Sequence, residues 1–182
     1  MFKKFNPKDD ISGQSLTKSS VQRAIRAKIL EQYPTLEPVM EDILPKKAPL
    51  VVVKCLDHVN LITVQGKILF YNTRDEPYFP TLRLLHQYPN CLPHVQVDRG
   101  AIKFVMGGAN IMCPGLTSKG ARLPVSLPKG SPCAVMAEGK DLALGIGQLT
   151  MSTDDIQKVN KGIGVENKHY LGDCLWSHPT IS

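Results

Sequence analysis

The sequence predicts an α+β protein, with an N-terminal α/β domain that contains a small antiparallel sheet and a C-terminal curled sheet or small barrel. Three observations predict this arrangement. Helical patterns and β-branched runs alternate over residues 1–92. Two prolines, Pro89 and Pro93, then interrupt the chain. Short apolar runs separated by turn residues follow at close spacing, which is typical of a barrel or a curled sheet.

Apolar periodicity and prolines predict the N-terminal helices. Residues 1–16 are polar with scattered apolar positions, and they suit an edge strand or a loose arm. Thr17 is the predicted N-cap of a helix that runs to about Tyr33, and a short second helix is expected over residues 36–44. The outer side of the first helix is basic, which is typical of a solvated surface: Arg23, Arg26 and Lys28.

The first sheet is predicted from β-branched and alternating residues. Strands are expected over residues 50–56, 59–64 and 67–71, with a hairpin turn at Gln65–Gly66. A helix over residues 81–88 follows Pro80 and ends before Pro89.

The stiff segment Pro89–Pro93 is the best candidate for a domain boundary. It divides the chain into an N-terminal domain over residues 1–92 and a second domain over residues 93–175. Residues 176–182 are then expected to form a C-terminal tail.

The second domain is organised around a helix, a glycine stop, a strand and a turn over residues 98–116. Asp98 is the predicted N-cap, and Gly107–Gly108 ends the helix. Residues 109–113 read as a buried strand and Pro114–Gly115 as a turn. The predicted inner face of the helix is Ala101, Ile102, Val105 and Met106.

The remaining elements are a loop, three strands and one helix. They are expected at residues 117–132 for the loop, at 133–138, 142–151 and 165–170 for the strands, and at 153–160 for a helix capped by Ser152.

Composition indicates an ordinary globular protein with a basic bias. Of the 182 residues, 42% are hydrophobic and 21% charged, and the net charge is +6. The five cysteines form no Cys-x-x-Cys pair, which favours reduced thiols over disulfides or a zinc site. No secretory signal and no apolar run of membrane-spanning length is present, so a cytoplasmic location without membrane contact is expected.

No motif in the sequence demands catalysis. Gly145-Ile-Gly147 and Gly162-Ile-Gly164 lack the third glycine or the lysine of a nucleotide loop, and they read as turns or packing glycines. The five histidines have no metal-ligand spacing, and no serine or cysteine lies in a nucleophile elbow. We therefore expect a protein that is not an enzyme and needs no cofactor and no metal.

The charge distribution points to an anionic partner for the second domain. Five basic residues and one acidic residue lie between Asp98 and Lys129, against four basic and six acidic residues from Glu138 to Asp173. A phosphate backbone is the expected ligand, although a solvated helix face accounts for the same pattern. The candidate RNA-binding residues are Arg99, Lys103, Lys119, Arg122 and Lys140.

Several segments resemble known proteins. Residues 98–116, 133–140 and 143–147 resemble a PUA domain, the pseudo-barrel RNA-binding module of pseudouridine synthases and archaeosine transglycosylases. The segments that span nearly the whole chain resemble the malignant T-cell-amplified sequence family: residues 1–5, 44–47, 79–86, 100–105, 109–118 and 158–164.

The resemblance implies a family-specific pre-PUA domain followed by a PUA pseudo-barrel. It also implies a partner, a homologue of density-regulated protein, and action on the small ribosomal subunit and tRNA. The family is associated with tRNA release after termination, reinitiation and non-standard initiation. Two alternatives stay open: an accessory subunit that presents RNA to a modification enzyme, and a protein scaffold without RNA binding.

The first sheet supplies candidates for the protein partner. Its apolar residues exceed what a small sheet needs to bury, and a surplus of this kind can form an exposed patch. The candidates are Leu61, Phe70 and Tyr78, although a purely structural role in the core explains each of them equally well.

Overall fold

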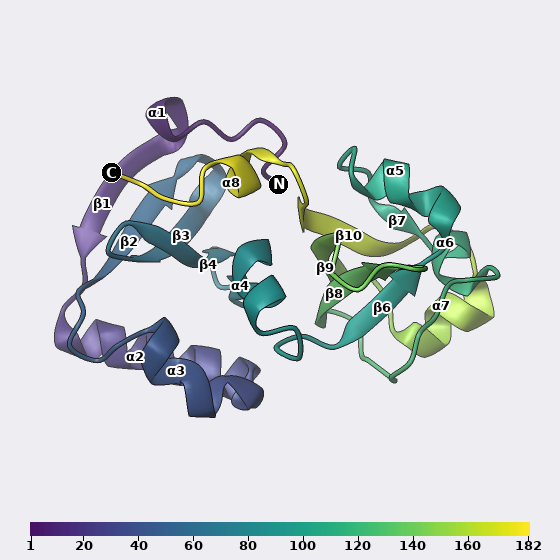
Figure 1. The fold of residues 1–182 in the computed structure, drawn as a ribbon, viewed down its shortest axis with the longest axis horizontal. Helices are drawn as coiled ribbons and strands as arrows, with labels where there is room; N and C mark the ends of the chain where they lie inside the picture. Colours follow the sequence, from purple (N-terminus) through teal and green to yellow (C-terminus); the bar gives the residue numbers. More distant parts are fainter.

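The computed structural model describes residues 1–182, which form two lobes joined by the segment around Pro89–Pro93 (Figure 1). The N-terminal lobe contains a five-stranded sheet in the order β1-β2-β3-β4-β5, in which every neighbouring pair is antiparallel. The C-terminal lobe contains a second five-stranded sheet in the order β6-β8-β9-β10-β7, in which β6 and β8 are parallel. The predicted α+β class, with a curled sheet in the second half, is confirmed.

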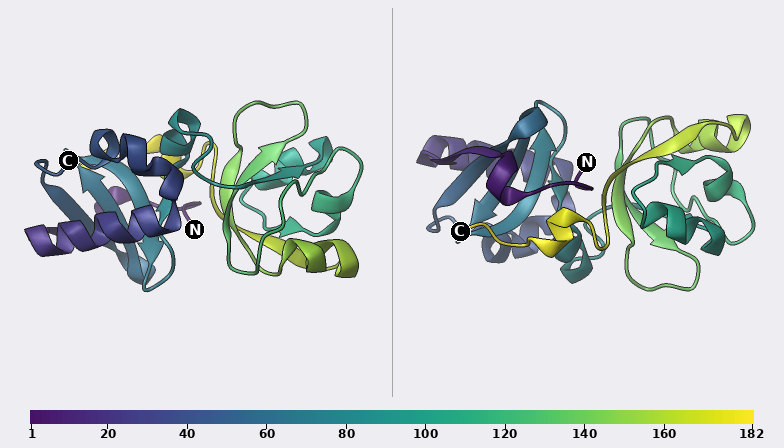
Figure 2. Two further views of the ribbon diagram at one scale, coloured as in Figure 1. Left: turned by 90° about the horizontal axis from the view of Figure 1, so that it is seen from below. Right: turned by 90° about the horizontal axis from the view of Figure 1, so that it is seen from above.

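Helices lie on both faces of the sheet in the N-terminal lobe. Helices α2 and α3 cover one side, and α1 and α8 (Cys174–Ser177) lie on the other (Figures 1 and 2). The elements are α1 (Pro7–Asp10), β1 (Ile11–Leu16), α2 (Ser19–Gln32), η1 (Pro34–Val39), α3 (Met40–Ile43), β2 (Leu50–Cys55), η2 (Leu56–His58), β3 (Val59–Val64), β4 (Lys67–Thr73), β5 (Phe79–Pro80) and α4 (Leu82–Gln87).

Local sequence explains most of these elements. Gln65 and Gly66 both have positive φ, 52° and 77°, as a two-residue hairpin between right-twisted strands requires. Thr81 caps α4, since its hydroxyl accepts a hydrogen bond from the Leu84 amide. Residues 11–16 form an edge strand that pairs with β2.

The predicted N-cap of α2 is wrong. The cap residue is Lys18, whose side chain makes no capping hydrogen bond. Thr17 instead donates its hydroxyl to the Leu50 carbonyl at 2.9 Å. Tertiary pairing with the start of β2 therefore outweighs the local capping preference of threonine.

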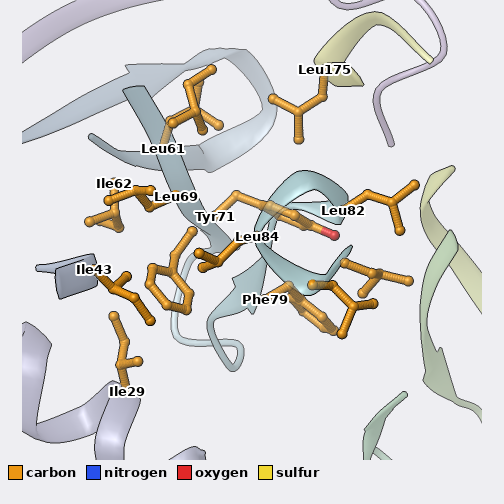
Figure 3. Packing of buried hydrophobic residues seen from close by; sticks show 14 of the residues in the cluster. Ile29, Ile43, Leu61, Ile62, Leu69, Tyr71, Phe79, Leu82, Leu84 and Leu175 are labelled. Carbon is orange, nitrogen blue, oxygen red and sulfur yellow. The ribbon is translucent and has the colours of Figure 1, made fainter. Parts of the chain in front are cut away.

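The core of the N-terminal lobe is centred on aromatic rings. Tyr71 stacks on Phe79 with ring centroids 5.5 Å apart (Figure 3). The ring of Phe2 meets the edge of the Tyr71 ring, with centroids 5.0 Å apart. The same cluster includes Ile146 of the second lobe and Leu175 of α8. One continuous apolar core thus crosses the seam between the lobes.

The C-terminal lobe forms a smaller core of 13 buried residues. Its elements are β6 (His94–Val97), η3 (Arg99–Ala101), α5 (Ile102–Val105), β7 (Ile111–Met112), α6 (Pro114–Thr117), β8 (Pro132–Ala137), β9 (Gly145–Leu149), α7 (Thr153–Val159) and β10 (Ile163–Tyr170). Asp98 and Ser152 are the observed N-caps of η3 and α7, as predicted. Gly145 and Gly147 lie within β9 and Gly164 within β10, so these three are packing glycines.

Two local predictions in this lobe are wrong. Pro114–Gly115 begins the helix α6 instead of a turn, since proline is well suited to the first helical position. Met106 is 42% exposed and does not join Val105 on the buried face. The helix is short and ends at residue 105, so Met106 lies at its C-cap, where helical periodicity no longer decides which side is buried.

The chain ends by returning to the N-terminal lobe. After α8 (Cys174–Ser177), the Ile68 amide donates to the Pro179 carbonyl at 3.0 Å and the Ile181 amide to the Gly66 carbonyl at 2.7 Å. Asp173 holds α8 in place, because its carboxylate accepts hydrogen bonds from the Tyr170 and Trp176 amides and contacts His169 Nδ1 at 2.6 Å. None of the helices has the length and apolar character needed to cross a membrane.

Candidate nucleic-acid interface

The candidate interface begins at Asp98, which joins two segments of the C-terminal lobe. Its Oδ1 accepts a hydrogen bond from the Ala101 amide at 2.9 Å, and its Oδ2 accepts one from the Ser118 hydroxyl. The start of η3 and the loop after α6 are therefore held side by side. Arg99 is the first residue of η3, and Lys119 follows Ser118 in the loop.

Four of the five predicted basic residues lie around Glu138, at the end of β8. The Arg99 amide donates to Glu138 Oε2 at 3.3 Å, and its guanidinium lies over Gly139, where an added Cβ would meet Nη2 at 2.7 Å. An added Cβ on Gly120 would meet the Glu138 carboxylate at 2.3 Å. Lys119 and Lys140 are the chain neighbours of these glycines, and Arg122 exchanges backbone hydrogen bonds with Gln96 of β6.

Lys103 lies apart from this group, on α5. Its Nζ is 5.1 Å from the centroid of the Phe104 ring. All five basic residues are exposed, and none forms an ion pair within the protein. Their charges are consequently available to an external anion.

An apolar cavity that the sequence did not predict lies next to Arg99, Lys103 and Lys119, which are chain neighbours of residues that line it. It has a volume of about 640 Å³ between α5, β7 and α6. Phe104 and Met112 line it with 57% and 49% of their surfaces exposed. An exposed aromatic beside lysine is a typical stacking platform for a nucleic-acid base. The sequence contained one indication of this cavity, because Phe104 is an aromatic residue that lies outside the predicted inner face of the helix.

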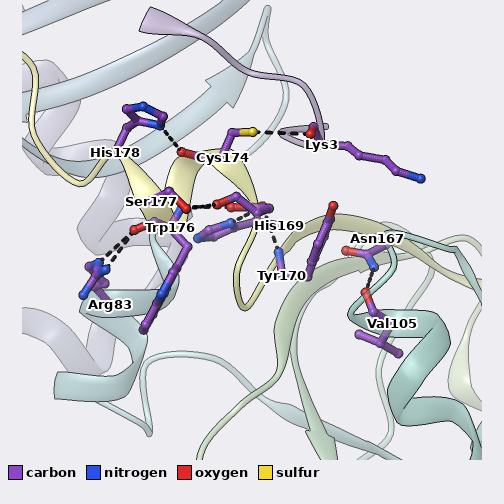
Figure 4. A network of polar contacts seen from close by, with 11 residues as sticks. Lys3, Arg83, Val105, Asn167, His169, Tyr170, Cys174, Trp176, Ser177 and His178 are labelled. Carbon is purple, nitrogen blue, oxygen red and sulfur yellow. Dashed lines mark hydrogen bonds and ion pairs between the residues drawn. The ribbon is translucent and has the colours of Figure 1, made fainter.

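The cavity wall is anchored to the sheet by asparagines. Asn167 of β10 donates its Nδ2 to the Val105 carbonyl and to the Ala109 carbonyl, both at 3.1 Å (Figure 4). The backbone amide of Asn167 donates a hydrogen bond to Asn110 Oδ1 at 3.0 Å. Because Asn167 is buried, the end of α5 and the start of β7 are held in fixed positions.

The predicted partner-binding residues occupy different environments. Leu61 and Phe70 are fully buried in the core of the N-terminal lobe, so they offer no surface to a partner in this structure. Alternation along β3 and β4 placed them correctly in strands, but both faces of this sheet are covered. Tyr78 is half-buried and lines a shallow groove on α2 with Val21 and Lys28.

The thiols show no feature of nucleophiles. All five cysteines are free, and four of them are buried. Burial raises the pKa of the Cys133 thiol to about 12 and that of Cys91 to about 12. No group of three or more metal-ligating side chains is arranged to hold an ion.

Comparison with known proteins identifies both halves of the chain. A family model described as a Pre-PUA-like domain matches residues 5–89, and one described as a PUA domain matches residues 93–171. A relative from Dictyostelium discoideum, "Malignant T-cell-amplified sequence 1 homolog", is 55% identical over 181 residues and covers 100% of both chains. The chain belongs to the malignant T-cell-amplified sequence family.

Further relatives extend this family and its fold. "Translation machinery-associated protein 20" of Eremothecium gossypii is 52% identical over 183 residues, with 100% of both chains covered. A crystal structure of a hypothetical protein from Pyrococcus horikoshii superposes with a TM-score of 0.71 at 23% identity, covering 92% of this chain and 100% of that one. At that identity the likeness concerns the fold alone. The family predicted from the sequence is confirmed.

Proposed function

We propose that this member of the family is a non-enzymatic, cytoplasmic translation factor that binds RNA through its PUA domain. In this proposal it acts with a homologue of density-regulated protein on the small ribosomal subunit and on tRNA. Its task is the release of tRNA after termination, reinitiation and non-standard initiation. Family membership and the names of the relatives support the connection with translation.

One observation carries the RNA-binding part of the proposal. Three exposed cations without an ion pair, Arg99, Lys103 and Lys119, are chain neighbours of residues that line a cavity in which Phe104 and Met112 are exposed. Cations bind the phosphate backbone irrespective of sequence, and an exposed aromatic ring can stack on a base. The combination suits a single-stranded end or loop of RNA better than a regular duplex.

The proposal divides the two tasks between the lobes. Residues 93–175 carry RNA, and residues 1–92 carry the protein partner, with Tyr78 as the remaining candidate contact. Residues 176–182 form the tail, which pairs with β4 of the N-terminal lobe.

The test is the double variant Arg99→Glu, Lys103→Glu in the full-length protein. Binding to purified small subunits and to tRNA is measured at two salt concentrations, beside a melting curve. Each lost phosphate contact lowers the salt slope by about 1 unit, and each surface change costs no more than about 0.5 kcal/mol of stability. Phe104→Ala, which removes the exposed ring, is expected to weaken tRNA binding at both salt concentrations by roughly 1–3 kcal/mol.

The charge-matched control is Lys8→Glu, Lys54→Glu, which reverses two exposed lysines on α1 and β2. Unchanged affinity of the Arg99, Lys103 variant with an unchanged melting curve would contradict the proposed RNA surface. Copurification with an RNA-modification enzyme in place of small subunits would favour the accessory role instead.

A further inference from the structure

A second basic groove lies on the N-terminal lobe, away from the PUA surface in the fold. It has a volume of about 490 Å³ and runs between α2 and the turn that precedes β2. Its charged lining residues are Arg23, Arg26 and Lys46, joined by the polar Ser19 and Gln22. The chain neighbours Lys18 and Lys47 are also exposed.

Hydrogen bonds hold the two walls of this groove together. Gln22 donates its Nε2 to the Ala48 carbonyl at 3.0 Å, with longer contacts to the carbonyls of Pro45 and Lys46. Glu41 accepts a hydrogen bond from the Lys46 amide at 3.1 Å. The turn is therefore fixed against the helix, and Lys46 is kept on the same groove as the arginines.

Arg26 is the unusual residue of the groove. Its side chain is only 10% exposed, and Nη2 contacts Glu41 Oε2 at 3.4 Å. The buried Nη1 has no hydrogen-bond partner. A buried donor without a partner costs free energy, and more so when it is charged. The sequence pattern predicted a solvated arginine here, and that prediction is wrong.

The N-terminus of α2 adds positive potential to the same place. This helix has 14 residues, and its cap residue makes no side-chain hydrogen bond to the first amides. Ser19, at the first helical position, lines the groove. Uncapped amides and the helix dipole both favour an anion here.

We propose that this groove binds phosphate groups of an RNA strand, as a second contact in addition to the PUA surface. Guanidinium groups match phosphate oxygens in a bidentate geometry, and the exposed Arg23 can bind in this way, while Arg26 and Lys46 add positive charge beside it. The lining offers only Ala27 and Leu30 as apolar contacts, which is less than a protein partner needs for an anchor. The proposal rests on the proposed function in one respect, namely that RNA is the ligand of this protein.

The main test is the double variant Arg23→Glu, Lys46→Glu of the full-length protein, with Lys8→Glu, Lys54→Glu as the charge-matched control. Both substituted groove residues are exposed, so the core stays intact. Binding of a labelled oligouridylate is measured against salt concentration. For a single-stranded RNA, the slope of the logarithm of the binding constant against the logarithm of salt concentration falls by about 0.7 for each phosphate contact that is lost. The groove variant should therefore lower this slope by roughly 1.4 units, and the control should leave it unchanged. Should the groove variant melt below the control, Arg23→Gln, Lys46→Gln replaces it.

Glu41→Gln tests the same groove with an expected increase in RNA affinity, where the first variant predicts a decrease. It removes the one carboxylate that contacts Arg26 while keeping an oxygen for the Lys46 amide. Oligouridylate should then bind more tightly than to the wild type. Weaker or unchanged binding would count against the groove.

The outcomes separate this inference from the proposed function. If only the Arg99, Lys103 variant loses RNA binding, the PUA surface stands and the groove is overturned. If only the groove variant loses it, the groove is supported and the PUA surface fails. Loss of binding to a polyglutamate peptide, with RNA binding intact, would identify the groove as a site for an acidic protein and overturn the proposal.

Discussion

At the scale of single residues, burial decides which chemistry is available. The thiols of Cys133 and Cys91 lie in the two cores, and burial raises the pKa of each from 9.0 to about 12. A neutral thiol suits an apolar core, whereas a thiolate would have to be desolvated. These cysteines therefore act as small apolar core residues.

This burial predicts a loss of stability in alkali. In the unfolded chain the thiols ionise near pH 9, whereas in the folded protein they stay protonated, so the unfolded state gains stability as the pH rises above 9. The free energy of unfolding should fall by about 1.4 kcal/mol at pH 10 for each such thiol. Urea unfolding under reducing conditions at pH 8 and pH 10 measures this. Cys133→Ala should show a smaller fall than the wild type, and identical pH profiles would contradict the argument.

At the scale of elements, the glycines of β9 let this strand lie close against β10 in the sheet of the PUA lobe. A Cβ on Gly147 would meet Val165 Cγ1 at 2.3 Å and the Glu166 carbonyl oxygen at 2.8 Å. Both atoms belong to the neighbouring strand β10, so any side chain would push the two strands apart. The motif Gly-Ile-Gly is thus a packing feature of a curled sheet and not a phosphate loop.

Gly147→Ala should consequently destabilise the protein by about 1–3 kcal/mol through overpacking. Gly13→Ala is the matched control, because Gly13 also lies in a strand, has no positive φ, and has no atom within 4 Å of an added Cβ. Thermal unfolding of both variants compares them directly. Equal melting temperatures would show that β9 and β10 separate without cost.

At the scale of the whole molecule, a shared apolar core joins the two lobes, and we expect them to unfold together. The C-terminal segment of the chain crosses back over the N-terminal lobe, where Arg83 of α4 contacts it. Its Nη2 donates to the Trp176 carbonyl at 2.8 Å, and its guanidinium lies 3.9 Å from the centroid of the Trp176 ring. An isolated fragment of residues 1–92 would lack Leu175 and Ile146 from its core, so binding experiments need the full chain.

Asp173→Ala tests this coupling. The carboxylate is fully buried and serves His169, Tyr170 and Trp176, so its removal leaves several buried polar groups unpaired. We expect a loss of about 3 kcal/mol or more. Amide hydrogen exchange should rise in both lobes, at β4 as well as at β10. Faster exchange confined to β10 would show that the lobes unfold independently.

The sequence by itself determined the class, the family and most elements, since these depend on local signals. Gln65–Gly66, the caps at Asp98 and Ser152, and the glycine stop after Val105 act within a few residues of chain. The exposure of the cationic residues from Arg99 to Lys140 could also be predicted, because charged side chains are almost always exposed.

Only the tertiary structure decided which residues are buried between elements. Leu61 and Phe70 are no longer candidates for partner contacts, because helices and the C-terminal tail cover both faces of their sheet. Phe104 and Met112 are new candidates for RNA contacts, because α5, β7 and α6 leave their side chains partly uncovered. Arg26 is buried and contacts Glu41 of α3, which lies 15 residues further along the chain. Periodicity reports which side of one element is apolar, and the packing of distant elements decides whether that side is covered.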